Sequence, residues 1–533
     1  MTPVTNGGAP VDVSTLCRHL AGEGTEVVQT HISLVLLRGG EVWKIKKPVD
    51  FGFLNFTTLA ARREACEAEV ALNRRLAPDV YLGVVPITWG SDGRLQLGGT
   101  GEPVEWAVHM RRLPDAGRAD VRLQQNQLGR PAVTRIAERL ATFHAEARCD
   151  AYTSSFGSVD VIERNVAENF AQTRESVTDH VTPEQAEEIE GWQRAVLREQ
   201  GDLFARRAAS GRVRDGHGDL RLEHVYIDDA SDEVRIIDCI EFNERFRYAD
   251  VASDIAFLAM DFARAGHVEL AEHLVAAYAR AAQDYDLYAV LDFYESYRAF
   301  VRAKIASLLA RDPNVDTQTS ERAAGSARRH YLLALASERR ALLGPQLVAV
   351  GGVIASGKST VAETLAAELS APIVDADRTR KHMLGVRETE AVHHDSWTGA
   401  YDPAFTEEVY DEVFRRAEVV LQSGRPVVVD ASFRSRALRE RARAAAERRG
   451  VAFRFVECRA DHEVCRARLR ERARSRSVSD GRVEIFDAFV AKWEPVEELP
   501  PHDHLVLDTT RPIADNLEHL RHSIATWPHG LIS

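Results

Sequence analysis

Residues 352–360 carry the pattern with the most specific chemistry in the chain. Gly-Val-Ile-Ala-Ser-Gly-Lys-Ser matches GxxxxGK[ST] and follows the apolar run at 347–350. Glycines let backbone N–H groups face a phosphate at a helix N-terminus, a lysine reaches the terminal phosphates, and a serine hydroxyl ligates magnesium. The pattern predicts that ATP contacts Gly352, Ser356, Gly357, Lys358, Ser359 and Thr360, with Ser359 also binding the metal.

Carboxylates end two strand-like segments of the same region. The first segment, 371–381, carries Asp375 and Asp377, with Arg380 three residues further on. The second, 426–430, is a Walker B-type strand ending in Asp430, an acid that could hold a magnesium-bound water. Strands and helices alternate from Gln346 onward, which is typical of a parallel α/β domain.

Residues 346–533 resemble the small-molecule and polynucleotide 5′-hydroxyl kinases among the P-loop phosphotransferases, a group that includes gluconate kinase and zeta-toxin relatives. The resemblance implies that Asp377 is the general base and that Arg380 clamps the acceptor or a phosphate. It also implies that Arg468 and Arg472, four residues apart on one helix face, are lid arginines that stabilise the transferred phosphoryl group.

A second group of acidic and histidine residues lies between 215 and 241. Asp215-Gly-His217-Gly-Asp219 leads to His224, and an apolar strand then ends at Asp238. This arrangement resembles the catalytic and metal-binding loops of the aminoglycoside phosphotransferase and choline kinase family. The resemblance implies Asp219 as catalytic base and Asp238 as metal ligand. His224 stands where that family has asparagine, so we expect it to join Asp238 at the metal and to favour Mn²⁺ relative to Mg²⁺.

That family also needs a strand lysine and a helix glutamate. Only seven of the 68 basic residues are lysines, and three of them lie at 44–47. Strand alternation places Lys44 and Lys46 on one face, so both remain candidates for the phosphate-binding lysine, with Lys44 preferred. Glu69 shares an apolar stripe of the helix predicted at 59–76, and we expect it to pair with the lysine. No glycine-rich loop precedes this strand, and 105–113 is the expected hinge contacting adenine.

The order of the predicted elements indicates two domains. Strands are expected at 25–37, 41–47, 80–88, 94–98 and 104–110, and long helices at 130–148, 183–208, 251–264, 267–284 and 287–310. Residues 312–326 are expected to be a loop and 328–343 a helix. The predicted fold is a bilobal, protein-kinase-like domain at 1–345 (small lobe about 1–113, helical lobe about 114–345), followed by a parallel-sheet P-loop kinase domain at 346–533.

Composition excludes several classes of protein. The chain is 45% hydrophobic and carries a formal charge of −13, which argues against a protein that coats nucleic acid. No apolar run approaches the about 18 residues that span a bilayer, and the N-terminus does not resemble a secretory leader. The six cysteines are scattered, as in a reducing compartment. We expect a cytoplasmic protein without membrane association.

These patterns together predict an ATP- and Mg²⁺-dependent kinase, with Mn²⁺ as a second possible metal, that phosphorylates a hydroxyl of a small molecule at one or two sites. One alternative makes the N-terminal domain a non-catalytic receptor that gates the P-loop kinase. Another makes the P-loop domain a toxin-like or nucleic-acid 5′-hydroxyl kinase, with the arginine-rich segment 434–449 following phosphates. The sequence leaves the acceptors and the oligomeric state open.

Overall fold

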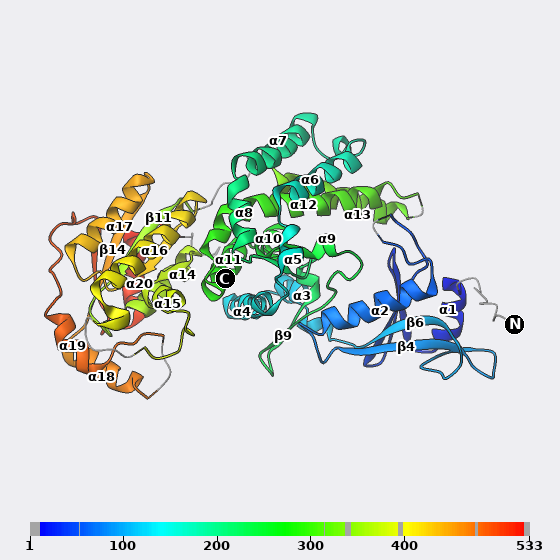
Figure 1. Cartoon of the computed structure of the whole chain (residues 1–533), viewed down its shortest axis with the longest axis horizontal. Helices are drawn as coiled ribbons and strands as arrows, with labels where there is room; N and C mark the ends of the chain where they lie inside the picture. The colour runs from blue at the N-terminus through cyan, green and yellow to red at the C-terminus, as the bar shows by residue number, and fades with distance from the viewer. Residues whose placement is uncertain are drawn as a thin grey trace. The chain divides into compact units, whose positions relative to one another are not determined.

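The computed structural model describes residues 11–52, 54–313, 315–335, 343–392, 398–474 and 478–526 (Figure 1). Backbone proximity divides the chain into two compact units. The first unit comprises Met1–Arg135, Thr142–Asn165 and Leu197–Asp261, and the second comprises Ile136–Ala141, Val166–Val196 and Phe262–Ser533. The predicted domain boundary at 345/346 stays a prediction. Among the described residues, no helix is long and apolar enough to cross a membrane.

The first unit begins with an antiparallel sheet between two helices. Its elements are α1 (Val13–Leu20), β1 (Thr25–Gln29), β2 (Ser33–Arg38), β3 (Glu41–Lys46), α2 (Leu59–Asn73), β4 (Tyr81–Trp89), β5 (Leu95–Leu97) and β6 (Pro103–Arg111). The six strands lie in the order β1-β2-β3-β6-β4-β5. Helix α2 lies along β6 and β4 (Figure 1).

Strand β3 is buried on both faces of this sheet, and its alternation decides where its lysines go. Trp43 and Ile45 pack with Leu16 and Leu20 of α1. Lys44 and Lys46 therefore project to the opposite face, where α2 covers Val108 of the neighbouring strand β6. The predicted sharing of one face by the two lysines is confirmed.

Helices dominate the chain after β6. They are η1 (Asp115–Gly117), α3 (Ala119–Gln124), α4 (Arg130–Glu146), α5 (Ala151–Ser155), α6 (Val159–Thr173), η2 (Val177–Asp179), α7 (Pro183–Glu199), α8 (Gly201–Ala209), α9 (Glu244–Arg247), α10 (Val251–Arg264), α11 (Val268–Ala282), η4 (Tyr285–Leu287), α12 (Tyr288–Ala310) and α13 (Thr317–Ala334). Short strands and one turn interrupt them: β7 (Val213–Asp215), η3 (Leu222–His224), β8 (Val225–Asp228), β9 (Glu233–Ile236) and β10 (Tyr248–Asp250).

Three predicted elements are wrong in this part of the chain. Residues 25–37 form two strands, because the Thr30 N–H donates to the Ser33 carbonyl and closes a hairpin turn. The helix expected at 183–208 breaks at Gln200. The loop expected at 312–326 is mostly α13, which the Asp316 carboxylate caps by accepting from the Thr319 N–H. The helix expected at 328–343 continues α13 to Ala334, and 336–342 lie outside the described residues.

The second unit contains a five-stranded parallel sheet in the order β12-β13-β11-β14-β15. Its elements are β11 (Gln346–Gly351), α14 (Lys358–Leu369), β12 (Ile373–Asp375), α15 (Ala376–Met383), η5 (Gly399–Tyr401), α16 (Pro403–Gln422), β13 (Val427–Asp430), α17 (Arg436–Arg448), β14 (Ala452–Arg459), α18 (His462–Arg472), α19 (Val483–Val490), β15 (His504–Asp508) and α20 (Ile513–Ser523).

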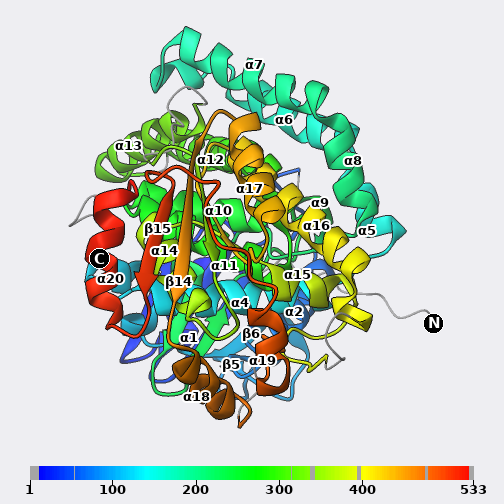
Figure 2. The ribbon, with the colours of Figure 1, turned by 90° about the vertical axis from the view of Figure 1, so that its left-hand side faces the viewer.

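Helices cover both faces of the parallel sheet. Val361 and Leu365 of α14 and Leu520 of α20 pack in one core cluster with the strands, and α16 and α17 contact β13 and β14. Figure 2 shows β14 and β15 side by side with α20 next to them. The predicted fold classes are therefore confirmed: an antiparallel sheet with a helical lobe, followed by a parallel α/β P-loop domain.

A buried histidine holds the loop that carries Asp219. His217 is fully buried, and its Nε2–H donates to the Ile237 carbonyl at 2.9 Å. Asp254 accepts from the N–H groups of both His217 and Gly218 at 2.7 and 3.0 Å. Burial lowers the pKa of His217 to about 4, so its imidazole is neutral in the folded protein.

This burial predicts a specific acid sensitivity. The unfolded chain binds a proton at His217 below about pH 6.5 whereas the folded chain does not, so stability falls as the pH drops from about 6.5 toward 4. The loss attributable to His217 is about 2 kcal/mol by pH 5. In thermal unfolding, the stability advantage of wild type over His217→Gln should therefore shrink between pH 7 and pH 5. The matched control is His31→Gln, at an exposed position, and a constant advantage would contradict the assignment.

Candidate active sites

The phosphate loop joins β11 to α14 with a tightly curled backbone. Gly352 has φ +148°, and a Cβ there would lie 2.5 Å from both the Cys458 carbonyl and Ser356 Oγ. Gly357 has φ +90° and begins α14. Ser356 Oγ is buried without a hydrogen-bond partner among the described residues, and Lys358 Nζ donates to the Val353 carbonyl at 2.9 Å. A glycine-requiring turn with open donors fits a bound phosphate chain.

Carboxylates gather beside this loop because three parallel strands end at one edge. Asp375 and Asp430 are register partners at the ends of β12 and β13. Burial and the charge of Asp375 raise the pKa of Asp430 to about 7, although Lys358 and a hydrogen bond from Ser359 oppose the shift. Carboxylates that resist ionisation are stabilised by a cation, so Ser359 and Asp430 fit a hard divalent metal such as Mg²⁺.

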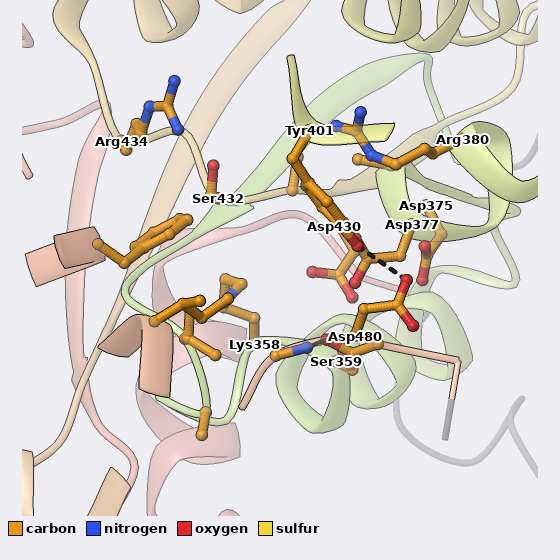
Figure 3. A pocket seen from close by; sticks show the side chains of 18 of the residues that line it. Lys358, Ser359, Asp375, Asp377, Arg380, Tyr401, Asp430, Ser432, Arg434 and Asp480 are labelled. Carbon is orange, nitrogen blue, oxygen red and sulfur yellow. Dashed lines mark hydrogen bonds between the residues drawn. The ribbon is translucent and has the colours of Figure 1, made fainter. Parts of the chain in front are cut away.

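Asp377 and Arg380 both line the same pocket as Lys358 and Ser359 (Figure 3). They lie three residues apart on α15, whose N-terminus Asp375 caps by accepting from the Arg378 N–H. Burial and Asp375 raise the pKa of Asp377. The strand-end spacing therefore does bring a half-buried carboxylate and a guanidinium into the pocket of the phosphate loop.

The two predicted lid arginines occupy different places. Arg472 lines the pocket, as expected. Arg468 instead donates to the carbonyls of Ala355 and Thr509 at 3.3 and 2.7 Å, so it braces the loop backbone. Gly357 and Thr360 line the pocket. Gly352 and Ser356 do not line it but lie close to each other within the loop.

Several residues in or beside the pocket were not assigned to this site by the sequence analysis, although Lys381 ends the segment 371–381 and Arg434 begins the segment 434–449 named there. Tyr401 donates its hydroxyl to Asp480 at 2.8 Å (Figure 3), and Lys381 pairs with the same carboxylate at 3.3 Å. Arg434, four residues after Asp430, also lines the pocket. These side chains come from segments far apart in the sequence, and no local spacing marks them. The scarcity of lysine was the single available signal, and it applied to Lys381 alone.

The arginine-rich segment proposed to follow phosphates is largely ion-paired. Arg441 contacts Glu407 and Asp411, and Arg448 contacts Glu418. Arg439 is fully buried and pairs with Glu498. Guanidinium groups already held by carboxylates offer little attraction to a phosphate backbone, so this helix gives no support to the nucleic-acid alternative.

In the first unit, five charged side chains form an alternating chain. Lys44 Nζ lies 2.9 Å from Glu69 and 2.6 Å from Asp238. Lys46 Nζ lies 2.5 Å from the other oxygen of Glu69 and also pairs with Glu241. Although burial opposes it, Asp238 and Glu69 hold the pKa of Lys44 well above its ordinary value. Lys44 therefore occupies the position expected of the phosphate-binding lysine, and Lys46 is buried behind it.

Asp219 and His224 face Asp238 from the loop before β8. His224 Nδ1 lies 2.8 Å from the Asp219 carbonyl, which can only accept, so Nδ1 carries the proton. The free lone pair of Nε2 accepts from Arg221 at 3.3 Å and lies 3.6 Å from Asp238 Oδ2. Despite burial, Lys44 and His224 lower the pKa of Asp238. A carboxylate and an imidazole nitrogen at this spacing fit two ligands of one metal ion.

One further expectation for this site needs correction. Most of the expected hinge, 105–113, belongs to strand β6, and Glu105 is buried in an ion pair with Arg62 at 2.8 Å. That pairing removes Glu105 from any contact with adenine. The sequence analysis also missed Glu241 and Arg221, because their partners Lys46 and Asp219 are identified only by the folded structure.

Comparison with known proteins finds matches for both parts of the chain. Residues 53–294 match the phosphotransferase enzyme family, and 347–496 match an AAA domain family. A putative aminoglycoside phosphotransferase from Ralstonia eutropha (15% identity, 60% of this chain, 96% of that one, TM-score 0.35) and a gluconokinase from Sinorhizobium meliloti (21%, 35%, 95%, TM-score 0.24) are similar solved structures.

The similarity to curated sequences extends over nearly the whole chain. Uncharacterized protein Rv2004c of Mycobacterium tuberculosis is 33% identical over 469 residues, which cover 88% of this chain and 90% of the relative. A relative in Mycobacterium bovis has the same identity and the same coverage. The chain thus carries two kinase-like domains, a phosphotransferase-family domain followed by a P-loop kinase domain. It belongs to the family of these mycobacterial proteins.

Proposed function

We propose that the P-loop domain transfers the γ-phosphoryl group of ATP to a hydroxyl of a small molecule. The observation that carries this proposal is one pocket in which Lys358 and Ser359 lie at one end and the half-buried carboxylate of Asp377 lies beside them toward the other end (Figure 3). A nucleotide-binding protein without transfer chemistry does not need a candidate general base in the pocket that holds its phosphates.

Each residue of the pocket has a role in this reaction. The loop N–H groups and Lys358 bind the phosphates, and Mg²⁺ held by Ser359 and Asp430 would neutralise charge on the β- and γ-phosphates. Asp377 orients the acceptor hydroxyl and takes its proton, a task that the raised pKa of this carboxylate favours. Arg472 reaches the pocket from α18, where it can stabilise charge on the transferred group.

We further propose that the N-terminal domain binds ATP, with Lys44 on the phosphates, Asp238 and His224 on the metal, and Asp219 as base. The support is that Lys44 contacts both Glu69 and Asp238. The competing possibility, a receptor that gates the second domain, differs in one observable: a receptor transfers no phosphate after Lys358 is disabled.

Lys358→Ala should abolish phosphoryl transfer by the second domain, because this lysine contributes charge at the phosphates rather than packing. The measurement is transfer from γ-labelled ATP to a pool of small metabolites by the full chain. Label that persists in Lys358→Ala and disappears when Asp219→Asn is added belongs to the first domain. The matched control is Lys492→Ala, at an exposed position. Unchanged total label in the Lys358→Ala, Asp219→Asn double variant would refute both sites.

Asp377→Asn should lower kcat of the second domain by about 100-fold or more, the range expected for loss of a general base. The dissociation constant of MgATP should stay within about threefold of wild type, because the carboxylate is assigned to the acceptor. Calorimetry and steady-state kinetics measure the two effects, with the exposed Asp411→Asn as control. Loss of nucleotide binding with normal turnover at saturating ATP would move Asp377 to the metal site instead.

His224→Asn should shift the metal preference of the first domain. Replacing an imidazole nitrogen with an amide oxygen should weaken Mn²⁺-dependent ATP binding relative to Mg²⁺-dependent binding, because oxygen suits the harder ion. Calorimetric titration of ATP with each metal, in a Lys358→Ala background that weakens the second site, measures the ratio, with His31→Asn as control. An identical Mn²⁺/Mg²⁺ ratio in the variant would remove His224 from the metal.

A further inference from the structure

Arg380 is a buried guanidinium in the acceptor pocket. Its residue is 5% exposed, and it lies on α15 one turn after Asp377. Nη1 donates to the Ala400 carbonyl at 2.5 Å and lies 3.5 Å from Thr406 Oγ1. The guanidinium lies over the Tyr401 ring, 4.6 Å from its centroid. These contacts fix the orientation of the side chain without neutralising its charge.

The remaining donors of Arg380 lack an anion. Within the described residues, no carboxylate forms an ion pair with Arg380, and its Nε is buried without a hydrogen-bond partner. Most other buried arginines of the chain differ: Arg62, Arg207 and Arg439 each pair with a carboxylate. The charge of Arg380 acts on the Asp377 carboxylate, but no ion pair joins the two among the described residues, so the buried guanidinium is only partly compensated. Burying a guanidinium without a direct counter-charge costs several kcal/mol, so a site that keeps one is suited to receive an anion.

A second positive charge lies in the same pocket. Arg434 lines the pocket from the loop after β13. Burial and the charge of Arg380 hold the pKa of Arg434 below its ordinary value, although Tyr410, Glu407 and Glu494 act in the opposite direction. The two guanidinium groups therefore repel each other, and an anion between them would relieve that repulsion.

The position of these arginines separates them from the nucleotide. In Figure 3, Arg380 and Arg434 lie at the end of the pocket opposite Lys358 and Ser359. Asp375, Asp377 and Asp430 lie between the two ends. The phosphates of ATP belong at the loop end, where Lys358 and α14 begin. The anion that suits Arg380 must then come from the other substrate.

We propose that the acceptor of the P-loop domain carries an oxyanion, a carboxylate or a phosphate ester, that binds the pocket-facing side of the Arg380 guanidinium, with Arg434 adding charge. The inference rests on the proposed kinase function of this pocket. Asp377 and Arg380 lie one helical turn apart, so the anionic group of the acceptor lies close to the hydroxyl that Asp377 deprotonates. A neutral polyol would leave the buried guanidinium unpaired and would bind weakly.

The first test divides a metabolite extract on anion-exchange resin. The retained and unretained fractions are offered separately to the full chain with γ-labelled ATP, in Asp219→Asn background. Lys358-dependent label in the retained fraction is expected, and label confined to the unretained fraction would overturn the inference. Phosphatase treatment of the retained fraction before the reaction distinguishes the sources, because it removes phosphate-ester acceptors and spares carboxylates.

Variants of the arginines test the assignment of residues. Arg380→Gln and Arg434→Gln should each raise at least tenfold the amount of retained fraction needed for half-maximal labelling, with MgATP affinity unchanged. Arg443→Gln, an exposed ion pair with Glu447 outside the pocket, is the matched control. A loss of MgATP affinity in Arg380→Gln, with normal dependence on the acceptor fraction, would make Arg380 a phosphate clamp and overturn the inference.

A binding measurement keeps the inference separate from the proposed function. With saturating MgADP in the phosphate loop, sulfate at constant ionic strength should raise the melting temperature of wild type by more than that of Arg380→Gln, or of Arg380→Lys if the first variant does not fold. Equal shifts would overturn the inference. If neither extract fraction is labelled but sulfate distinguishes the proteins, transfer to a small hydroxyl fails while the anion site stands.

Discussion

The cost of burying charge governs both sites of this protein. In the first unit, Lys44, Lys46, Glu69, Asp238 and Glu241 alternate in sign, so each buried charge contacts an opposite one. In the P-loop pocket, carboxylates face one another and Arg380 lacks a carboxylate partner among the described residues. The first site is electrostatically complete without ligands, whereas the second needs a cation and an anion to reach the same state.

This contrast has consequences for how each site changes on binding. Lys44 is shared between Glu69 and Asp238, so phosphates and a metal must compete with existing contacts. The ion pair between Lys46 and Glu69 does not involve Lys44 and joins α2 to strand β3. In the P-loop pocket, substrates add counter-charges rather than replace them. Binding there should be coupled to proton release from carboxylates such as Asp430.

Local patterns were good predictors where the chemistry depends on the backbone nearby. The GxxxxGKS loop, the helix that follows it and the strand ending at Asp430 all appear as expected, because turn glycines and apolar spacing act within a few residues. The first part of α13 was missed since its polar surface resembles a loop, whereas in the structure the Asp316 cap and the packing of buried Ala323 and Ala327 favour the helix. Residues 25–37 form a hairpin for a similarly non-local reason: β1 needs β2 as its partner.

The residue types and spacings in the chain were sufficient to identify two kinase-like domains, to suggest Asp219 and Asp377 as candidate bases, and to place the two lysines of strand β3 on one face. They were not sufficient to separate Lys44 from Lys46, or to find Tyr401, Arg434, Glu241 and Asp480. Those distinctions depend on which side chain meets Glu69 and on how α15, η5 and the loop after β13 converge on one pocket. Whether a side chain is buried, and whether it has an oppositely charged partner, depends on segments that are distant in the sequence and meet only in the folded chain. No short stretch of sequence contains that information.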